Sequence, residues 1–237
     1  MGFGRQAQRR GGSPRPGGLT GWGEHSGVAF RLFISHGAAD RRRAAELAAA
    51  LEDPGVSGLV AHDAITPGAE WISELRAALD GGDALAAVLV RGFHESAWTD
   101  QEVGYVLGQG KFAIALIVDQ APEGFLGASQ GLRVAQRAAS DVAPELVPVL
   151  CEDLRTAPRM QEALVHRLVN LTSWAMSNQV VELLGRRTSV TAEQLARLRE
   201  AQAVNREVGE AFAVGPFLDA RAAELGLATD IEGTAAS

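Results

Sequence analysis

Two uninterrupted apolar runs constrain most strongly what this chain can fold into. Residues 84–90 read Ala-Leu-Ala-Ala-Val-Leu-Val and residues 112–118 read Phe-Ala-Ile-Ala-Leu-Ile-Val, without alternating polar positions. Strands of this kind are buried on both faces, as in the centre of a parallel sheet. Both runs are too short for a membrane-spanning helix, which needs about 20 residues. The sequence therefore predicts a parallel sheet covered on both faces, and no membrane association.

Further strands and helices alternate around these two runs. Shorter strands are predicted at 30–35, 58–62 and, at an edge of the sheet, 132–134, and apolar residues at helical spacing predict helices at 44–51, 71–79 and 96–108. A strand–helix–strand order of this kind is typical of α/β proteins with a parallel sheet. The predicted fold is a flavodoxin-like sheet with helices on both faces.

Composition divides the chain into four segments. Residues 1–27 are rich in Gly, Arg and Pro and are predicted to be disordered, residues 28–140 form the α/β domain, residues 141–227 form an all-α region, and residues 228–237 form a flexible tail. In the helical region, Thr191-Ala192-Glu193-Gln194 predicts a capping box that starts a helix. An apolar stripe from Leu195 to Phe212 is expected to continue that helix.

The composition also restricts the classes of function. The formal net charge of −7 argues against nucleic acid as a partner. A single cysteine, Cys151, excludes an internal disulfide framework and fits a reducing compartment, and the sequence shows no Cys/His cluster for a metal site. The N-terminal arginines lack the apolar segment of a secretory signal. The expected location is cytoplasmic.

Trp98 and Glu102 are the most informative candidates for a functional site. An acid four residues after a Trp shares its helix face, so Glu102 is predicted on the apolar stripe, where a carboxylate is costly unless it is used or paired. The same acid near a helix start also fits a simple partner of the helix dipole. Ser35-His36, the 63–70 loop and the 96–102 segment follow strands, so all three are expected at the carboxyl edge of the sheet, where ligands bind. A Glu beside an aromatic at that edge suits cationic sugar chemistry.

Three segments together resemble Toll/interleukin-1 receptor (TIR) domains. Phe33-Ile34-Ser35-His36, followed by an acid at Asp40, is similar to their first strand and loop. The segment from Asp63 to Trp71 is similar to their second-strand loop, in which Pro-Gly precedes a Trp-bearing helix. Ser96-Ala97-Trp98 with Glu102 resembles the Ser-x-Trp-x-x-x-Glu motif of bacterial members. The resemblance covers roughly residues 28–140, and the helical remainder resembles no family that we recognise.

The chain departs from the TIR pattern at two points. Gly37-Ala38-Ala39 is smaller and less polar than the usual segment, and Asp63-Ala64 lacks the second acid of some members. The acidic catalytic position is present at Glu102.

The resemblance implies cleavage of NAD⁺, as substrate and not as cofactor, at the nicotinamide–ribose bond. Glu102 is then the catalytic residue, and Ser35 and His36 line the nucleotide site. For His36 the alternative interpretation is a solvated loop residue without a role. Three further residues have two interpretations each. Trp98 either shapes the ribose pocket or packs its helix onto the sheet, and Ser96 either contacts the ligand or caps the helix. Trp71 either stacks on the ligand or belongs to the core.

The leading hypothesis is an NAD⁺ hydrolase or cyclase that acts as a defence or signalling effector and is activated by self-association through TIR surfaces. One alternative is a non-catalytic adaptor that acts by TIR–TIR association, and another is a nucleoside deoxyribosyltransferase-like enzyme. No Gly-x-Gly-x-x-Gly follows the first strand, which argues against a Rossmann dehydrogenase site. The helical region is expected to regulate or assemble the domain, with a regulatory partner of its own as one option.

Overall fold

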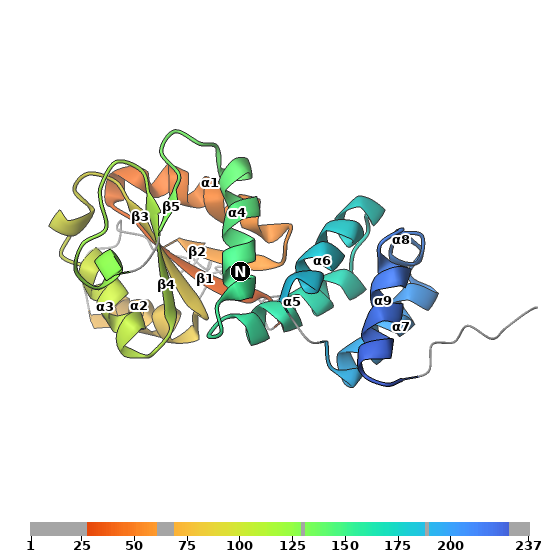
Figure 1. Cartoon of the computed structure of the whole chain (residues 1–237). Helices are drawn as coiled ribbons and strands as arrows, with labels where there is room; N and C mark the ends of the chain where they lie inside the picture. Colours follow the sequence, from red (N-terminus) through yellow and green to blue (C-terminus); the bar gives the residue numbers. More distant parts are fainter. Residues whose placement is uncertain (1–27, 61–68, 129–130, 188–189, 228–237) are drawn as a thin grey trace, which may run out of the picture.

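The structure is a computed structural model that describes residues 28–60, 69–128, 131–187 and 190–227. The predicted tails, residues 1–27 and 228–237, lie outside the described residues. So do residues 61–62 of the predicted strand 58–62 and residues 63–68 of the predicted loop. Five parallel strands form one sheet in the order β2-β1-β3-β4-β5 (Figure 1). The predicted parallel sheet is therefore confirmed.

The strands lie close to where the apolar patterns predict them. The bounds are β1 Phe30–Ser35, β2 Val56–Val60, β3 Ala84–Leu89, β4 Phe112–Ile117 and β5 Leu132–Arg133. Strand β2 begins at Val56 instead of Gly58, because Val56 pairs with Phe30 and its side chain is buried. The short strand β5 lies at the edge of the sheet beside β4, as predicted.

Helices cover both faces of the sheet. Helices α1 (Arg41–Glu52) and α4 (Ala139–Glu152) pack on one face, and α2 (Ala69–Gly81) and α3 (Thr99–Gly108) pack on the other. Side chains of β1 alternate between the two cores, with Ile34 in the α1–α4 core and Phe33 in the α2–α3 core. This double covering explains why β3 and β4 are apolar without alternation.

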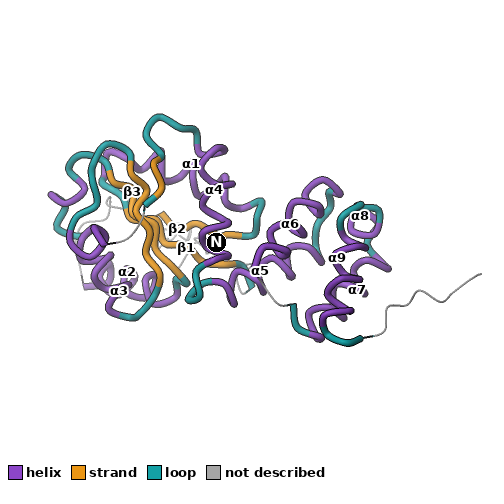
Figure 2. The backbone as a smooth tube through the Cα atoms, viewed as in Figure 1, coloured by secondary structure: helices purple, strands orange, loops and turns teal. Residues whose placement is uncertain are grey.

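Helix α4 belongs to the layer that covers the sheet. It packs against α1, and its buried side chains share one core with β1, β3 and β4. The expected boundary between residues 140 and 141 falls inside this helix. Five further helices follow and form what we call the helical module: α5 (Ala157–Val169), α6 (Trp174–Arg187), α7 (Ala192–Val204), α8 (Arg206–Gly209) and α9 (Val214–Glu224) (Figure 2).

The capping box at the start of α7 is confirmed, but the continuous stripe to Phe212 is wrong. Thr191 and Gln194 exchange both hydrogen bonds of the box. Helix α7 ends at Val204 because the backbone of Asn205 is extended. The side-chain oxygen of Asn205 accepts from the backbone N–H of Glu207, so Asn205 caps the start of α8. Val204 and Phe212 are consequently 79% and 77% exposed.

Helix α5 lies across the amino edge of the sheet, where the strands begin. The guanidinium of Arg155, just before the helix, lies 4.9 Å from the Phe112 ring at the start of β4. Arg159 Nε donates to Asp83, next to β3, at 3.2 Å, and Arg167 Nε donates to the carbonyl of Asp53, near β2, at 2.9 Å. The helical module is therefore attached at the edge opposite Ser35, and its core is continuous with that of the sheet.

Candidate functional site

Ser35 and Glu102, which are 67 positions apart in the sequence, meet in a buried hydrogen bond. Ser35 Oγ donates to Glu102 Oε2 at 2.6 Å. Ser35 is the last residue of β1 and Glu102 lies in the first turn of α3, so the carboxyl edge of the sheet brings them together. The two residues are 0% and 6% exposed. The bond length is typical of a hydroxyl bound to a carboxylate, and the pair forms the centre of the candidate site.

Helix α3 begins three residues later than predicted. It starts at Thr99 instead of Ser96, and a short 3₁₀ helix at Phe93–Glu95 precedes it. Ser96 does not cap α3: its Oγ accepts from the backbone N–H of Trp98 at 3.3 Å, within the turn before the helix. The N–H of Glu102 bonds to the carbonyl of Trp98 at 2.9 Å, which keeps the predicted spacing between these two residues.

A cleft of about 280 Å³ lies between α2 and α3, next to this pair. Its described lining consists of Ile72, Leu75, Arg76 and Leu79 from α2 and Trp98, Gln101, Glu102 and Tyr105 from the α3 segment. The volume is near the lower end of the range for small-molecule sites. One wall therefore holds a carboxylate beside aromatic rings, and the opposite wall holds a cation.

Trp71 lies behind Trp98 and not in the described lining of the cleft. The two rings meet edge to face, with centroids 4.5 Å apart and an interplanar angle of 83°. Trp71 is 6% exposed, and its indole N–H has no hydrogen-bond partner within the described parts of the chain. This packing favours the core interpretation for Trp71 and holds the Trp98 ring in the lining of the cleft.

His36 is buried directly after β1. Its Nδ1 lies 3.0 Å from the carbonyl oxygen of Ile34, so the ring is turned toward the backbone of its own strand. The structure places His36 next to Ser35 in the chain, but His36 is not among the described residues that line the cleft.

A polar cluster around Asp80 contacts Tyr105, one of the residues that line the cleft. Tyr105 Oη and Gln109 Nε2 donate to Asp80 Oδ1 at 2.9 and 2.6 Å, and Lys111 Nζ donates to the Leu79 and Asp80 carbonyls. The hydrogen bonds from Gln109 and Tyr105 lower the pKa of Asp80, and Asp80 in turn raises the pKa of Tyr105. Burial lowers the pKa of Lys111. Neither this cluster nor Arg76 is predicted from the sequence, because the contact between α2 and α3 decides which of their residues face each other.

The described residues hold no group of three or more His, Cys, Asp or Glu side chains placed to bind a metal ion. Within those same segments, every helix is too short or too polar to cross a membrane.

A comparison with family models matches residues 32–138 to the TIR domain. The match begins within β1 and ends just before α4, and it includes Ser35, the Trp71–Trp98 pair and Glu102. A comparison with curated proteins finds no significant match. The sequence motifs, the five-stranded parallel sheet and the family match agree, so residues 32–138 of this chain form a TIR domain, which is followed by a helical C-terminal region.

Proposed function

We propose that this protein cleaves NAD⁺ at the nicotinamide–ribose bond, as a hydrolase or cyclase. TIR domains serve in signalling, as NAD⁺-cleaving enzymes or as adaptors. The observation that carries the enzymatic proposal is the buried Ser35–Glu102 pair, whose carboxylate lines the cleft between α2 and α3. An adaptor has no need of a carboxylate at this depth, where removing it from water is costly.

The chemistry requires one well-placed carboxylate. Breaking the nicotinamide–ribose bond builds positive charge on the ribose, as in an oxocarbenium ion. The ionised Glu102 carboxylate stabilises that charge and accepts hydrogen bonds from ribose hydroxyls. Nicotinamide leaves as a neutral molecule, so no strong general acid is needed. Attack by water at the ribose carbon then gives ADP-ribose, and attack by a nitrogen of the adenine gives a cyclic product.

The neighbouring residues have supporting roles in this proposal. Ser35 holds the carboxylate in one orientation through its hydroxyl, which donates at 2.6 Å. The Trp98 ring, held by Trp71, forms an aromatic wall of the cleft. Arg76, on the opposite wall, supplies a cation for the diphosphate of the substrate.

We further propose that the enzyme is a defence or signalling effector that works on assembly. TIR domains commonly self-associate, so turnover is expected to rise faster than linearly with protein concentration. The helical module is then available for a regulatory partner, because it is attached at the edge of the sheet opposite the Ser35–Glu102 pair.

Replacement of Glu102 by Gln tests the proposal. Gln keeps the shape and can still accept from Ser35, but it removes the charge. We expect the rate of NAD⁺ cleavage to fall by about 10²–10³ or more, as when a transition-state charge partner is lost. Glu95→Gln is the matched control, since Glu95 is exposed and lies just upstream of the same helix. Chromatography of NAD⁺ and its products over a series of protein concentrations measures both variants.

The other functions give different results in the same assay. A wild type that forms TIR–TIR complexes without consuming NAD⁺ is an adaptor. A wild type that exchanges bases on added deoxynucleosides is a deoxyribosyltransferase-like enzyme. Unchanged turnover in a folded Glu102→Gln variant contradicts the catalytic assignment.

A further inference from the structure

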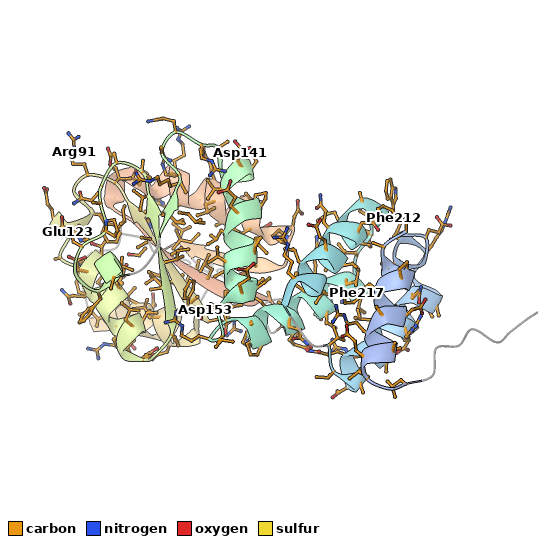
Figure 3. The ribbon with its side chains drawn as sticks, in the orientation of Figure 1. Arg91, Glu123, Asp141, Asp153, Phe212 and Phe217 are labelled. Atoms are coloured by element: carbon orange, nitrogen blue, oxygen red, sulfur yellow. The ribbon has the colours of Figure 1, made fainter. Side chains whose placement is uncertain are left out.

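A second cavity, of about 460 Å³, lies where α1, α4 and α6 meet, and we call it the α6 groove. It is on the α1–α4 face of the sheet, opposite the face that holds the candidate site. Its floor is apolar and buried, with Ala143 and Val147 from α4 and Val180 from α6. Figure 3 marks the two ends of α4 by Asp141 and Asp153, and α6 lies to the side of this helix. The groove is therefore shared by the sheet layer and the helical module.

The charges at the rim of the α6 groove are paired within the chain. Arg167 Nη2 lies 3.8 Å from Asp53 Oδ1, and Arg186 Nη2 donates to Glu182 Oε1 at 3.0 Å. Most of the lining is apolar and includes three proline rings and a thioether: Ala50, Pro54, Ala143, Pro144, Val147, Pro148, Met176, Val180 and Leu183. Methionine sulfur makes favourable contacts with aromatic rings. The groove is therefore suited to an uncharged aromatic group.

The described chain begins beside this groove. Phe30 pairs with Val56 in the parallel ladder of β1 and β2, and its N–H donates to the carbonyl of Gly55 at 3.2 Å. Because the two strands are parallel, the residues before Phe30 continue along the residues before Val56. This register places Val28, the first described residue, level with Pro54, which lines the groove. The segment that precedes Val28 is therefore attached next to the groove.

That segment carries a tryptophan within reach of the whole groove. Trp22 lies between two glycines, eight residues before Phe30, and is the largest apolar side chain in residues 1–27. Eight residues span up to about 26–29 Å when fully extended. The groove follows α4 only from Ser140 to Pro148, a distance of about 12 Å along the helix axis. An indole ring that is buried removes about 150–250 Å² from water, so Trp22 gains more from an apolar site than its neighbours do.

We propose that the α6 groove binds the chain's own segment around Trp22, with the indole ring on Ala143, Val147 and Val180. The short tether gives Trp22 an effective concentration on the order of millimolar at the groove, so weak apolar contacts are sufficient for occupancy. In this position Trp22 contacts α4 of the sheet layer and α6 of the helical module. The amino-terminal segment thereby links the two parts of the chain.

The first test is fluorine NMR of the full-length protein labelled with 5-fluorotryptophan. The signal of Trp22 is identified by its absence in Trp22→Phe, and in the wild type it is expected away from its position in the urea-unfolded protein. Ala50→Phe fills the groove from α1 and is expected to return this signal to the unfolded position. Ala49→Phe is the matched control and should leave the signal in place, since Ala49 is exposed and outside the lining. The signals of Trp71 and Trp98 show whether each variant is folded.

The second test is competition with 1-methylnaphthalene, an uncharged aromatic probe, measured by equilibrium dialysis on the full-length protein. The probe is expected to bind Trp22→Ala about tenfold more tightly than the wild type, because it no longer competes with the tethered indole. His25→Ala keeps Trp22 and is the matched control, with an affinity expected to equal that of the wild type. Adding Ala50→Phe to Trp22→Ala is expected to remove the gain, which assigns the probe to the groove.

Four results overturn the proposal. The first is a wild-type Trp22 signal at the unfolded position, and the second is a signal that responds to Ala50→Phe no more than to Ala49→Phe. The third is equal affinity of the probe for the wild type and Trp22→Ala. The fourth is a shifted Trp22 signal that grows with protein concentration, because it would place Trp22 in the groove of a second copy. None of these results depends on whether Glu102 cleaves NAD⁺.

Discussion

At the scale of single residues, the candidate site depends on how Glu102 is held. Glu102 is 6% exposed, and its carboxylate accepts from Ser35 Oγ, a donor at the end of the buried strand β1. A fixed carboxylate avoids reorganisation as charge develops on the substrate, and preorganised charges of this kind contribute strongly to catalysis. Ser35 is thus a positioning residue in the proposed enzyme.

Replacement of Ser35 by Ala is predicted to slow NAD⁺ cleavage without removing the catalytic group. The lost hydrogen bond is made to a charged group, so we expect a decrease of about tenfold or more. Ser35→Thr, which keeps the hydroxyl, is expected to restore most of the rate. An unchanged rate in Ser35→Ala would leave the hydrogen bond without a role in the reaction.

At the scale of elements, helix α5 joins the helical module to the sheet. Arg159 and Arg167 lie on one face of the helix, two turns apart, and reach the starts of neighbouring strands. Asp83 is central to this contact, since it accepts from the backbone N–H of Arg31 at 2.8 Å and from Arg159 Nε at 3.2 Å. The contact couples α5 to β1 and β3, which are neighbours in the sheet.

Asp83→Ala is predicted to lower the free energy of unfolding by about 1–3 kcal/mol, because the partly buried backbone N–H of Arg31 loses this acceptor and the Arg159 guanidinium keeps only its bond to the Ala29 carbonyl. Glu210→Ala is the control, since its pair with Arg206 is exposed on both sides and such pairs contribute at most about 0.5 kcal/mol. Urea denaturation measures both variants. Equal effects of the two substitutions would show that the Asp83 contact behaves as a surface ion pair.

At the scale of the whole molecule, the TIR domain and the helical module share a core. Buried side chains form one continuous cluster from Phe30 in β1 to Ala222 in α9. Helix α4, which directly follows the TIR match, covers the sheet, so the expected boundary between residues 140 and 141 divides a helix that the sheet needs. The two parts are therefore expected to unfold together.

A single unfolding transition is predicted for a full-length variant with Trp22→Phe and Trp174→Phe. Its fluorescence then comes from Trp71 and Trp98 and reports on the α2–α3 side of the TIR domain, whereas far-ultraviolet circular dichroism reports on all helices. The two signals should give the same denaturant midpoint, as expected for one cooperative unit. Two separate midpoints would mean that the helical module unfolds independently.

The sequence by itself determines the elements whose signals are local. The apolar runs 84–90 and 112–118 specify central strands because only a doubly covered strand buries both of its faces. The capping box at Thr191 starts α7 as predicted, since its hydrogen bonds join residues only three positions apart. Ser35 and Glu102 could also be placed at one edge, because the carboxyl ends of parallel strands coincide.

The tertiary structure decides what depends on contacts between distant segments. Helix α3 starts at Thr99 after a turn in which Thr99 Oγ1 donates to the Phe93 carbonyl. In the helical module, Asn205 interrupts the predicted stripe, and its side-chain amide donates to the carbonyls of Val169 and Leu171. The packing of whole helices in one particular register decides two further features. It places Arg76 opposite Glu102 across the cleft, and it places α5 across the amino edge of the sheet. Local periodicity shows which face of a helix is buried, but the partner of that face is set by the packing of the complete chain.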